Sequence, residues 1–169
     1  DFTKMGGLYR GVKLIAVEPV HIALNDSGSC GVYITPRNIS GTSADIGILV
    51  KLDKAETAEA KAVIYDPQGK PVTEFFGRAD KDRITLSGKI NCPKRAEITL
   101  FCNGKPVDSI EQEFGIRSYL IDADNGFFLN GKPYPLHGVN YHQDSYESGW
   151  AMTDAQRERD YHIIRDMGC

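Results

Sequence analysis

Residues 125–142 read NGFFLNGKPYPLHGVNYH, a run that joins a hairpin to a second extended segment. Apolar residues lead into Asn130-Gly131, and both members of this pair tolerate positive φ, which favours a two-residue turn. Pro133 and Pro135 follow the turn and cannot donate ladder hydrogen bonds, so we expect the returning arm at a sheet edge. The run therefore begins with a predicted hairpin that has one edge strand.

Residues 136–142 are predicted to form a further strand. Side chains alternate between the two faces of a strand, which places Asn140 and His142 on the face opposite to Tyr141. Two polar side chains that share one face at the end of an apolar strand are more typical of a ligand site than of a core. This strand is therefore the first candidate for a functional site.

Short apolar segments, separated by turn residues, fill the chain before this run. Their lengths and spacing predict an all-β sandwich. Residues 54–62 are rich in Ala, Glu and Lys, which leaves a helical turn open there, although the connectivity of a sandwich favours a strand. The expected strands are residues 12–16, 20–24, 30–35, 46–52, 61–65, 72–76, 84–86, 96–101 and 107–114.

The pattern becomes helical after the run. Thr153 and Gln156 have the spacing of a capping box, and the apolar residues at 163, 164 and 167 recur with the period of a helix. We therefore expect a helix over residues 154–167, with Gly168 in the C′ position. The strand and this helix make a single β/α unit, which needs further units to bury its apolar faces.

Composition narrows the classes of function. The chain has 169 residues, a net charge of −3 and a pI near 5.8. Its basic residues are scattered, so we expect no nucleic-acid partner. No apolar run has the length of a membrane span, so we expect no membrane partner. The sequence shows no signal peptide but begins abruptly at Asp1, so a leader that is absent from the sequence stays open. Periplasmic and cytoplasmic locations both stay open.

The cysteines and most of the histidines give no sign of a metal site. The four cysteines, at positions 30, 92, 102 and 169, lack the spacing of zinc ligands. Cys30 and Cys102 fall in expected strands, where a free cysteine behaves as a small buried hydrophobe. His21, His137 and His162 have no partner at a ligand spacing, so no metal-binding residue is predicted.

Three motifs resemble one protein family. They are FGIR at residues 114–117, FLNGKP at 128–133 and HGVNYHQD at 137–144. Together they are similar to the junction between sandwich and barrel in glycoside hydrolase family 2, which contains β-galactosidases, β-glucuronidases and β-mannosidases. GLYR at residues 7–10 resembles the segment that follows the jelly roll of these enzymes. The YHQD form, with GWA at 149–151, is more similar to β-galactosidase-like members than to glucuronidases.

The resemblance implies a mainly β fold, in which an immunoglobulin-like β-sandwich precedes the first β/α unit of a TIM (β/α)8 barrel. Residues 1–11 would end a jelly roll or linker, residues 12–117 would form the sandwich, and residues 118–169 would begin a truncated catalytic barrel. The sandwiches of the family carry an additional stretch where this chain passes from Pro93 to Ala96. That difference indicates either a deletion or a loop that is absent from the sequence.

The resemblance implies no catalytic residue in this segment. Retaining glycosidases use two carboxylates, and in this family they are glutamates on later barrel strands, one of them in an Asn-Glu pair. The chain contains no Asn-Glu pair. The acidic residues of the expected helix are interpreted as capping and solubilising charges. They are Asp154, Glu158 and Asp160.

Four residues are predicted to bind substrate. The resemblance matches His142 to a histidine that hydrogen-bonds the first sugar, and an imidazole can donate and accept at once. Asn140 is either an orienting residue of the site or a strand-end amide. Asp144 either contacts sugar or accepts hydrogen bonds within its loop. Trp150 is either a platform for a sugar ring or an anchor of its loop.

Two functions stay open. In the first, the chain is part of a retaining exo-β-glycosidase that hydrolyses O-glycosidic bonds in carbohydrate metabolism. Its partners would be an oligosaccharide or β-glycoside substrate and the remaining domains of the parent enzyme. No cofactor is predicted, and a divalent metal in a full-length enzyme stays open. In the second, the chain is a non-catalytic immunoglobulin-like module that binds carbohydrate or protein, since a sandwich alone fixes no function.

Overall fold

The computed structural model describes residues 12–54, 57–91 and 95–169, which fall into two compact units. The first unit, Ala16–Ser118, holds β1 (His21–Ile22), β2 (Val32–Arg37), β3 (Ala44–Asp53), β4 (Ala58–Tyr65), β5 (Pro71–Asp80), β6 (Arg83–Ile90), β7 (Arg95–Cys102) and β8 (Lys105–Glu113). The second unit holds β9 (Tyr119–Asp122), β10 (Gly126–Leu129), β11 (Lys132–Pro133) and α1 (Asp154–Asp166).

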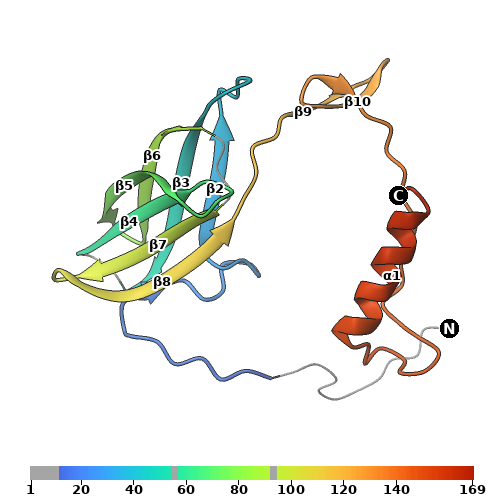
Figure 1. The fold of residues 1–169 in the computed structure, drawn as a ribbon. Helices are drawn as coiled ribbons and strands as arrows, with labels where there is room; N and C mark the ends of the chain where they lie inside the picture. Colours follow the sequence, from blue (N-terminus) through green and yellow to red (C-terminus); the bar gives the residue numbers. More distant parts are fainter. Residues whose placement is uncertain (1–11, 55–56, 92–94) are drawn as a thin grey trace. The chain divides into compact units, whose positions relative to one another are not determined.

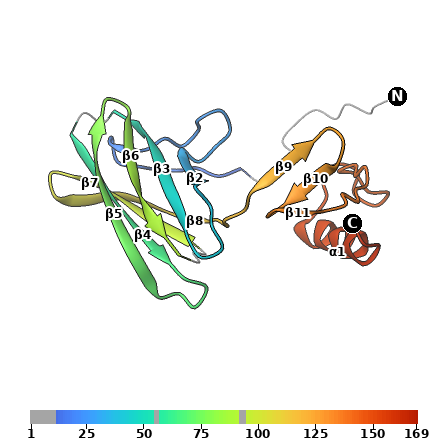
Figure 2. The same cartoon turned by 90° about the horizontal axis from the view of Figure 1, so that it is seen from above.

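The strands of the first unit form one antiparallel sheet that folds over into two layers (Figures 1 and 2). β1, β2, β3 and β6 make one layer, and β5, β4, β7 and β8 make the other. β5 connects the layers, because it pairs with β4 along most of its length and with β6 through Ala79 and Asp80. At the open side, the backbone N–H of Ile22 in β1 donates to Asp108 Oδ2 in β8 at 2.8 Å. The sheet is therefore nearly closed around its core.

The core lies between the layers because the strands alternate buried and outward side chains. In β3 every second residue from Ala44 to Leu52 is buried, and β4 and β7 show the same period of two. Ile48, Ile64 and Ile98 are fully buried. This alternation confirms the prediction of a mainly β sandwich.

Gly77 in β5 lies against β6 without room for a side chain. A Cβ atom at this position would lie 2.7 Å from Ile84 Cγ2 and 2.9 Å from the backbone oxygen of Thr85. Ile84 is fully buried and the oxygen of Thr85 belongs to the backbone of β6, so neither atom has room to move away. A glycine is therefore required where β5 crosses from one layer to the other.

The second unit begins with the predicted hairpin. β9, β10 and β11 form an antiparallel sheet with β10 at its centre. Asn130 and Gly131 connect β10 to β11 with φ values of 51° and 76°, and Pro133 lies in the edge strand. The ring of Phe127 stacks on Tyr119 at 6.3 Å and meets Tyr134 edge-on at 6.4 Å. The turn and the edge position are confirmed.

Two predicted strands are absent from the described structure. Residues 12–16 form no strand, and Leu14 is fully exposed. Residues 136–142 form no strand either. A strand of a parallel barrel needs neighbours on both sides, and the described residues provide none for this segment. These two predictions are wrong because apolar periodicity does not supply a pairing partner.

Other predictions have mixed outcomes. Residues 58–62 belong to β4, so the strand alternative for the Ala-rich segment is confirmed, with residues 55 and 56 outside the described part. Cys30 is exposed and Cys102 half-buried, so their prediction as buried core residues is wrong.

The GLYR motif, Cys92 and Pro93 lie outside the described residues. Among those that are described, no helix has the length and apolar content needed to cross a membrane.

Candidate functional site

Helix α1 begins at a complete capping box. The backbone N–H of Thr153 donates to Gln156 Oε1 at 2.8 Å, and the backbone N–H of Gln156 donates to Thr153 Oγ1 at 3.3 Å. These bonds satisfy donors that the first turn of a helix would otherwise leave unpaired. Gly168 follows the C-cap residue Met167 with a φ of 88°. Both predicted ends of the helix are confirmed.

The loop before the helix is held by its own hydrogen bonds. Ser145 and Gly149 exchange backbone hydrogen bonds of 3.0 and 2.9 Å, and the hydroxyls of Ser145 and Ser148 lie 2.8 Å apart. The side-chain amide of Gln156 donates to Ser148 Oγ at 3.4 Å, which joins the loop to the first turn of α1. The loop therefore has a defined conformation relative to the helix.

Tyr141 connects the segment before the loop to the same helix. Its hydroxyl donates to Asp160 Oδ2 at 3.0 Å and lies 3.8 Å from Met152 Sδ, and its ring lies 5.6 Å from that of Tyr161. Met152 is buried. Burial, and next the hydrogen bond to Asp160, raise the pKa of Tyr141 above its ordinary value of 10.0. The phenol is therefore neutral at physiological pH and donates steadily to the carboxylate.

Three of the predicted site residues lie close to Tyr141 in the sequence. Asn140 and His142 flank Tyr141 and are exposed, as is Asp144. Within the part of the chain that the structure describes, no hydrogen bond or ion pair involves any of the three side chains. Donors and acceptors of this kind are free to bind a polyhydroxylated ligand. The structure brings them onto one short segment, without a direct hydrogen bond among them.

Trp150 lies at the end of the loop, directly after Gly149. About a third of its surface, 36%, is exposed. An indole that is partly packed and partly accessible is compatible both with anchoring the loop and with stacking against a ligand. The two interpretations of Trp150 therefore both remain.

The sequence interpretation missed the role of Asp160. This residue was assigned to the solvent-facing charges of the helix, yet it is half-buried and accepts the hydrogen bond of Tyr141. Two features of the sequence could have indicated this contact. Asp160 lies one turn before the apolar positions 163 and 164, and Tyr141 precedes His142, so the alternation of an extended segment places the two side chains on opposite faces. Asp160 and Met152 therefore position the segment that carries the candidate ligands.

The side chains of the candidate site are suited to hydrogen bonding and stacking. No group of three or more His, Cys, Asp or Glu side chains within residues 12–54, 57–91 and 95–169 is placed to hold a metal ion. The pKa of Asp122, the last residue of β9, is lowered by the backbone N–H groups of Asn125 and Asp124, which explains this carboxylate as the acceptor of the turn that follows. What the site can offer is an imidazole, an amide, a carboxylate and an indole for a polar ligand.

Comparison with known proteins finds similar sequences among glycosidases. No family model matches it. The β-glucuronidase of Bacteroides fragilis is 33% identical over 99% of the chain, which spans 27% of that protein. The β-galactosidase BoGH2A of Bacteroides ovatus is 26% identical over 96% of the chain, which spans 21% of that protein.

A solved structure agrees with these relatives. The β-glucuronidase of Bacteroides uniformis matches 90% of the chain with a TM-score of 0.75 and 28% identity, and the chain covers 21% of that structure. The chain thus spans about a quarter or less of the proteins that it matches. It is related, over nearly its whole length, to a segment of the β-glucuronidases and β-galactosidases of glycoside hydrolase family 2.

Proposed function

We propose that this chain is part of a retaining exo-β-glycosidase, in which residues 118–169 begin the catalytic barrel and the sandwich supports it. The observation that carries this proposal is the arrangement around Tyr141. Its bond to Asp160 fixes the segment on helix α1, while Asn140 and His142 stay exposed without a protein partner. The similarity to β-glucuronidases and β-galactosidases supports a glycoside as the ligand.

The proposed reaction is hydrolysis of the bond to a terminal sugar with retention at the anomeric carbon. One carboxylic acid protonates the leaving oxygen, and a carboxylate roughly 5–5.5 Å away forms the glycosyl-enzyme intermediate. Water, deprotonated by the first group, then displaces this carboxylate and releases the sugar. Both groups are glutamates that we assign to parts of the enzyme beyond these residues. The contribution of this segment is to bind and orient the sugar, which makes the attack effectively intramolecular.

Each candidate residue has a separate task in this proposal. The His142 imidazole donates to one hydroxyl of the terminal sugar and accepts from its neighbour. Asn140 and Asp144 contact further hydroxyls, and Trp150 packs against a C–H face of the ring. Tyr141 does not touch the sugar; it positions the backbone between Asn140 and His142 through Asp160.

The first experiment compares two proteins. We expect the purified 169-residue chain to release no nitrophenol from nitrophenyl β-galactoside or β-glucuronide, because it lacks the catalytic glutamates. We expect the protein encoded by the complete gene to hydrolyse at least one of the two substrates. Enzyme-like turnover by the 169-residue chain, or inactivity of the complete protein on every nitrophenyl β-glycoside, would refute the proposal.

The second experiment tests the assigned residue in the complete protein. His142→Ala removes hydrogen bonds to the sugar and is expected to lower kcat/KM by about tenfold or more. His162→Ala is the matched control, because His162 is an exposed histidine of helix α1 that the proposal leaves without a function. Equal kcat/KM values for the two variants would remove His142 from the site.

A further inference from the structure

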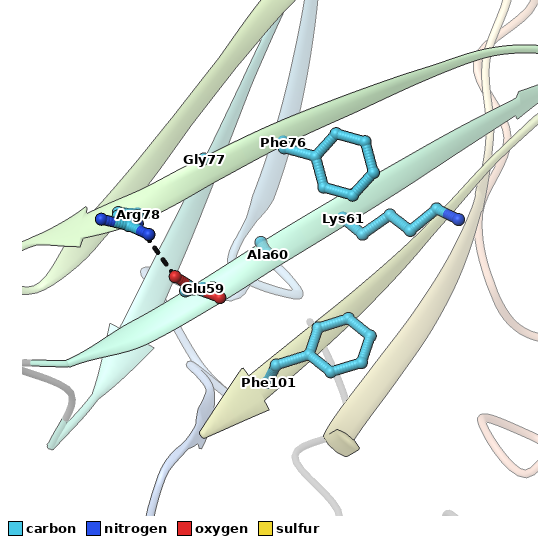
Figure 3. A pocket seen from close by; sticks show the side chains of 7 residues that line it. All are labelled: Glu59, Ala60, Lys61, Phe76, Gly77, Arg78 and Phe101. Atoms are coloured by element: carbon cyan, nitrogen blue, oxygen red, sulfur yellow. Dashed lines mark ion pairs between the residues drawn. The ribbon is translucent and has the colours of Figure 1, made fainter. Parts of the chain in front are cut away.

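A pocket lies on the outer face of the sandwich, over β4 and its two neighbouring strands (Figure 3). Its volume is about 390 Å³, which lies within the roughly 300–1,000 Å³ of small-ligand sites. Phe76 of β5 and Phe101 of β7 form its walls, and residues 59–61 of β4 form its floor. We refer to this pocket as the β4 groove.

The two aromatic rings of the β4 groove are offset across the strand between them. Phe76 is in register with Lys61 and Phe101 with Glu59, so the rings are two residues apart along β4. Neighbouring strands lie about 4.8 Å apart, which places the backbones of β5 and β7 about 10 Å apart. Figure 3 shows the two rings on opposite sides of Ala60 and Lys61. A ligand that touches both rings must be extended and longer than one sugar ring.

The charged side chains at the groove are paired with each other. Arg78 Nε lies 2.9 Å from Glu59 Oε1, and Lys61 Nζ lies 2.8 Å from Glu74 Oε1. Lys61 Nζ also lies 5.6 Å from the centre of the Phe76 ring. An anionic ligand would have to break these ion pairs, so the groove is not suited to nucleic acid or to an acidic peptide.

The same pairs suit a neutral ligand that is rich in hydroxyls. A sugar hydroxyl donates and accepts at once, and the groove offers carboxylate acceptors beside ammonium and guanidinium donors. The C–H faces of a sugar pack against aromatic rings, and Phe76 is 70% exposed on its strand. A purely apolar partner would satisfy the rings but would leave both ion pairs desolvated.

We propose that the β4 groove binds a neutral oligosaccharide without cleaving it. The two phenylalanines contact successive parts of the glycan, and the Glu59–Arg78 and Lys61–Glu74 pairs hydrogen-bond its hydroxyls. This function goes beyond the hydrolytic site, because it uses side chains of the sandwich alone. It holds or fails independently of whether residues 118–169 belong to a glycosidase.

The test measures glycan binding by the 169-residue chain with isothermal titration calorimetry. The probes are cellohexaose, xylohexaose and β-1,4-galactohexaose, with hexagalacturonic acid as an anionic comparison. We expect at least one neutral hexasaccharide to bind more tightly than hexagalacturonic acid. Phe76→Ala and Phe101→Ala are each expected to weaken that binding by about tenfold. Tyr119→Ala is the matched control, since it removes an exposed aromatic side chain from the second unit.

Several outcomes would overturn the proposal. One is the absence of binding by all three neutral probes at millimolar concentration. Another is binding that His142→Ala abolishes while Phe76→Ala leaves it unchanged, which would place the glycan at the hydrolytic site alone. A third is self-association that Phe76→Ala removes, seen by sedimentation velocity, which would identify the face as a contact between copies. Circular dichroism of both phenylalanine variants confirms that their sheets are intact, because both side chains are outside the core.

Discussion

Gly77→Ala should destabilise the sandwich. The added methyl group would lie 2.7 Å from Ile84 Cγ2 and 2.9 Å from the Thr85 backbone oxygen, so β5 and β6 must separate to admit it. Overpacking of this kind costs about 1–3 kcal/mol. Alanine also restricts the unfolded chain, which offsets about 0.4–1 kcal/mol. We therefore expect the free energy of unfolding to fall by about 1–2 kcal/mol.

The measurement is thermal and urea unfolding of the chain, followed by far-ultraviolet circular dichroism, which reports mainly on the sheet. For a unit of the size of Ala16–Ser118, each kcal/mol of lost stability lowers Tm by about 4–8 °C. Gly47→Ala is the control, because a Cβ atom there would meet only the Thr35 oxygen, at 3.9 Å. We expect its Tm to stay equal to the wild type or to rise. A Tm of Gly77→Ala at or above that of Gly47→Ala would refute the reasoning.

Three further predictions concern the second unit. Thr153→Ala removes the capping hydroxyl and should cost the helix about 1 kcal/mol; faster amide hydrogen exchange in the first turn of α1 should report it, while Thr153→Ser should exchange like the wild type. The raised pKa of Tyr141 means that its contact with Asp160 stabilises fully below pH 10.0 and is lost as the pH rises through the higher folded value. Trp150 fluorescence should therefore show unfolding that becomes easier above pH 10.0, and a Tyr141→Phe variant with the same pH profile would contradict this. The lowered pKa of Asp122 means that its turn contributes stability above its ordinary value of 3.8, lost as the pH falls through the lower folded value. Asp122→Asn should remove this acid dependence, and an unchanged acid profile would contradict it.

The turns, the helix cap and the alternation of the strands could be predicted from the sequence, because each depends on a few neighbouring residues. The Asn130-Gly131 turn and the Thr153–Gln156 box have the expected geometry, since positive φ and side-chain capping are decided within four residues. The alternating burial of β3 follows likewise from a period of two in the sequence. Of these features, the alternation belongs to the sandwich and predicts its class without any tertiary information.

Pairing and side-chain contacts could not be predicted in the same way. Residues 136–142 have the apolar pattern of a strand, but a strand is completed by partners that a local pattern does not specify. Asp160 resembles any other helix charge until Tyr141 is placed beside it. Cys30 resembles a core residue although it lies just before β2, where it is exposed. The four predicted substrate-binding residues stay a prediction, as do the domain boundaries.

The open side of the eight-stranded sheet has a consequence for solubility. A sheet that stops short of closure exposes backbone groups on which a strand of another molecule could add. Here β1 is only two residues long, β2 contains Pro36, and Asp108 of β8 already accepts the N–H of Ile22. The short β1 and the proline in β2 therefore offer an incoming strand little to pair with, and the nine-residue β8 is the border where such addition would have the most backbone available.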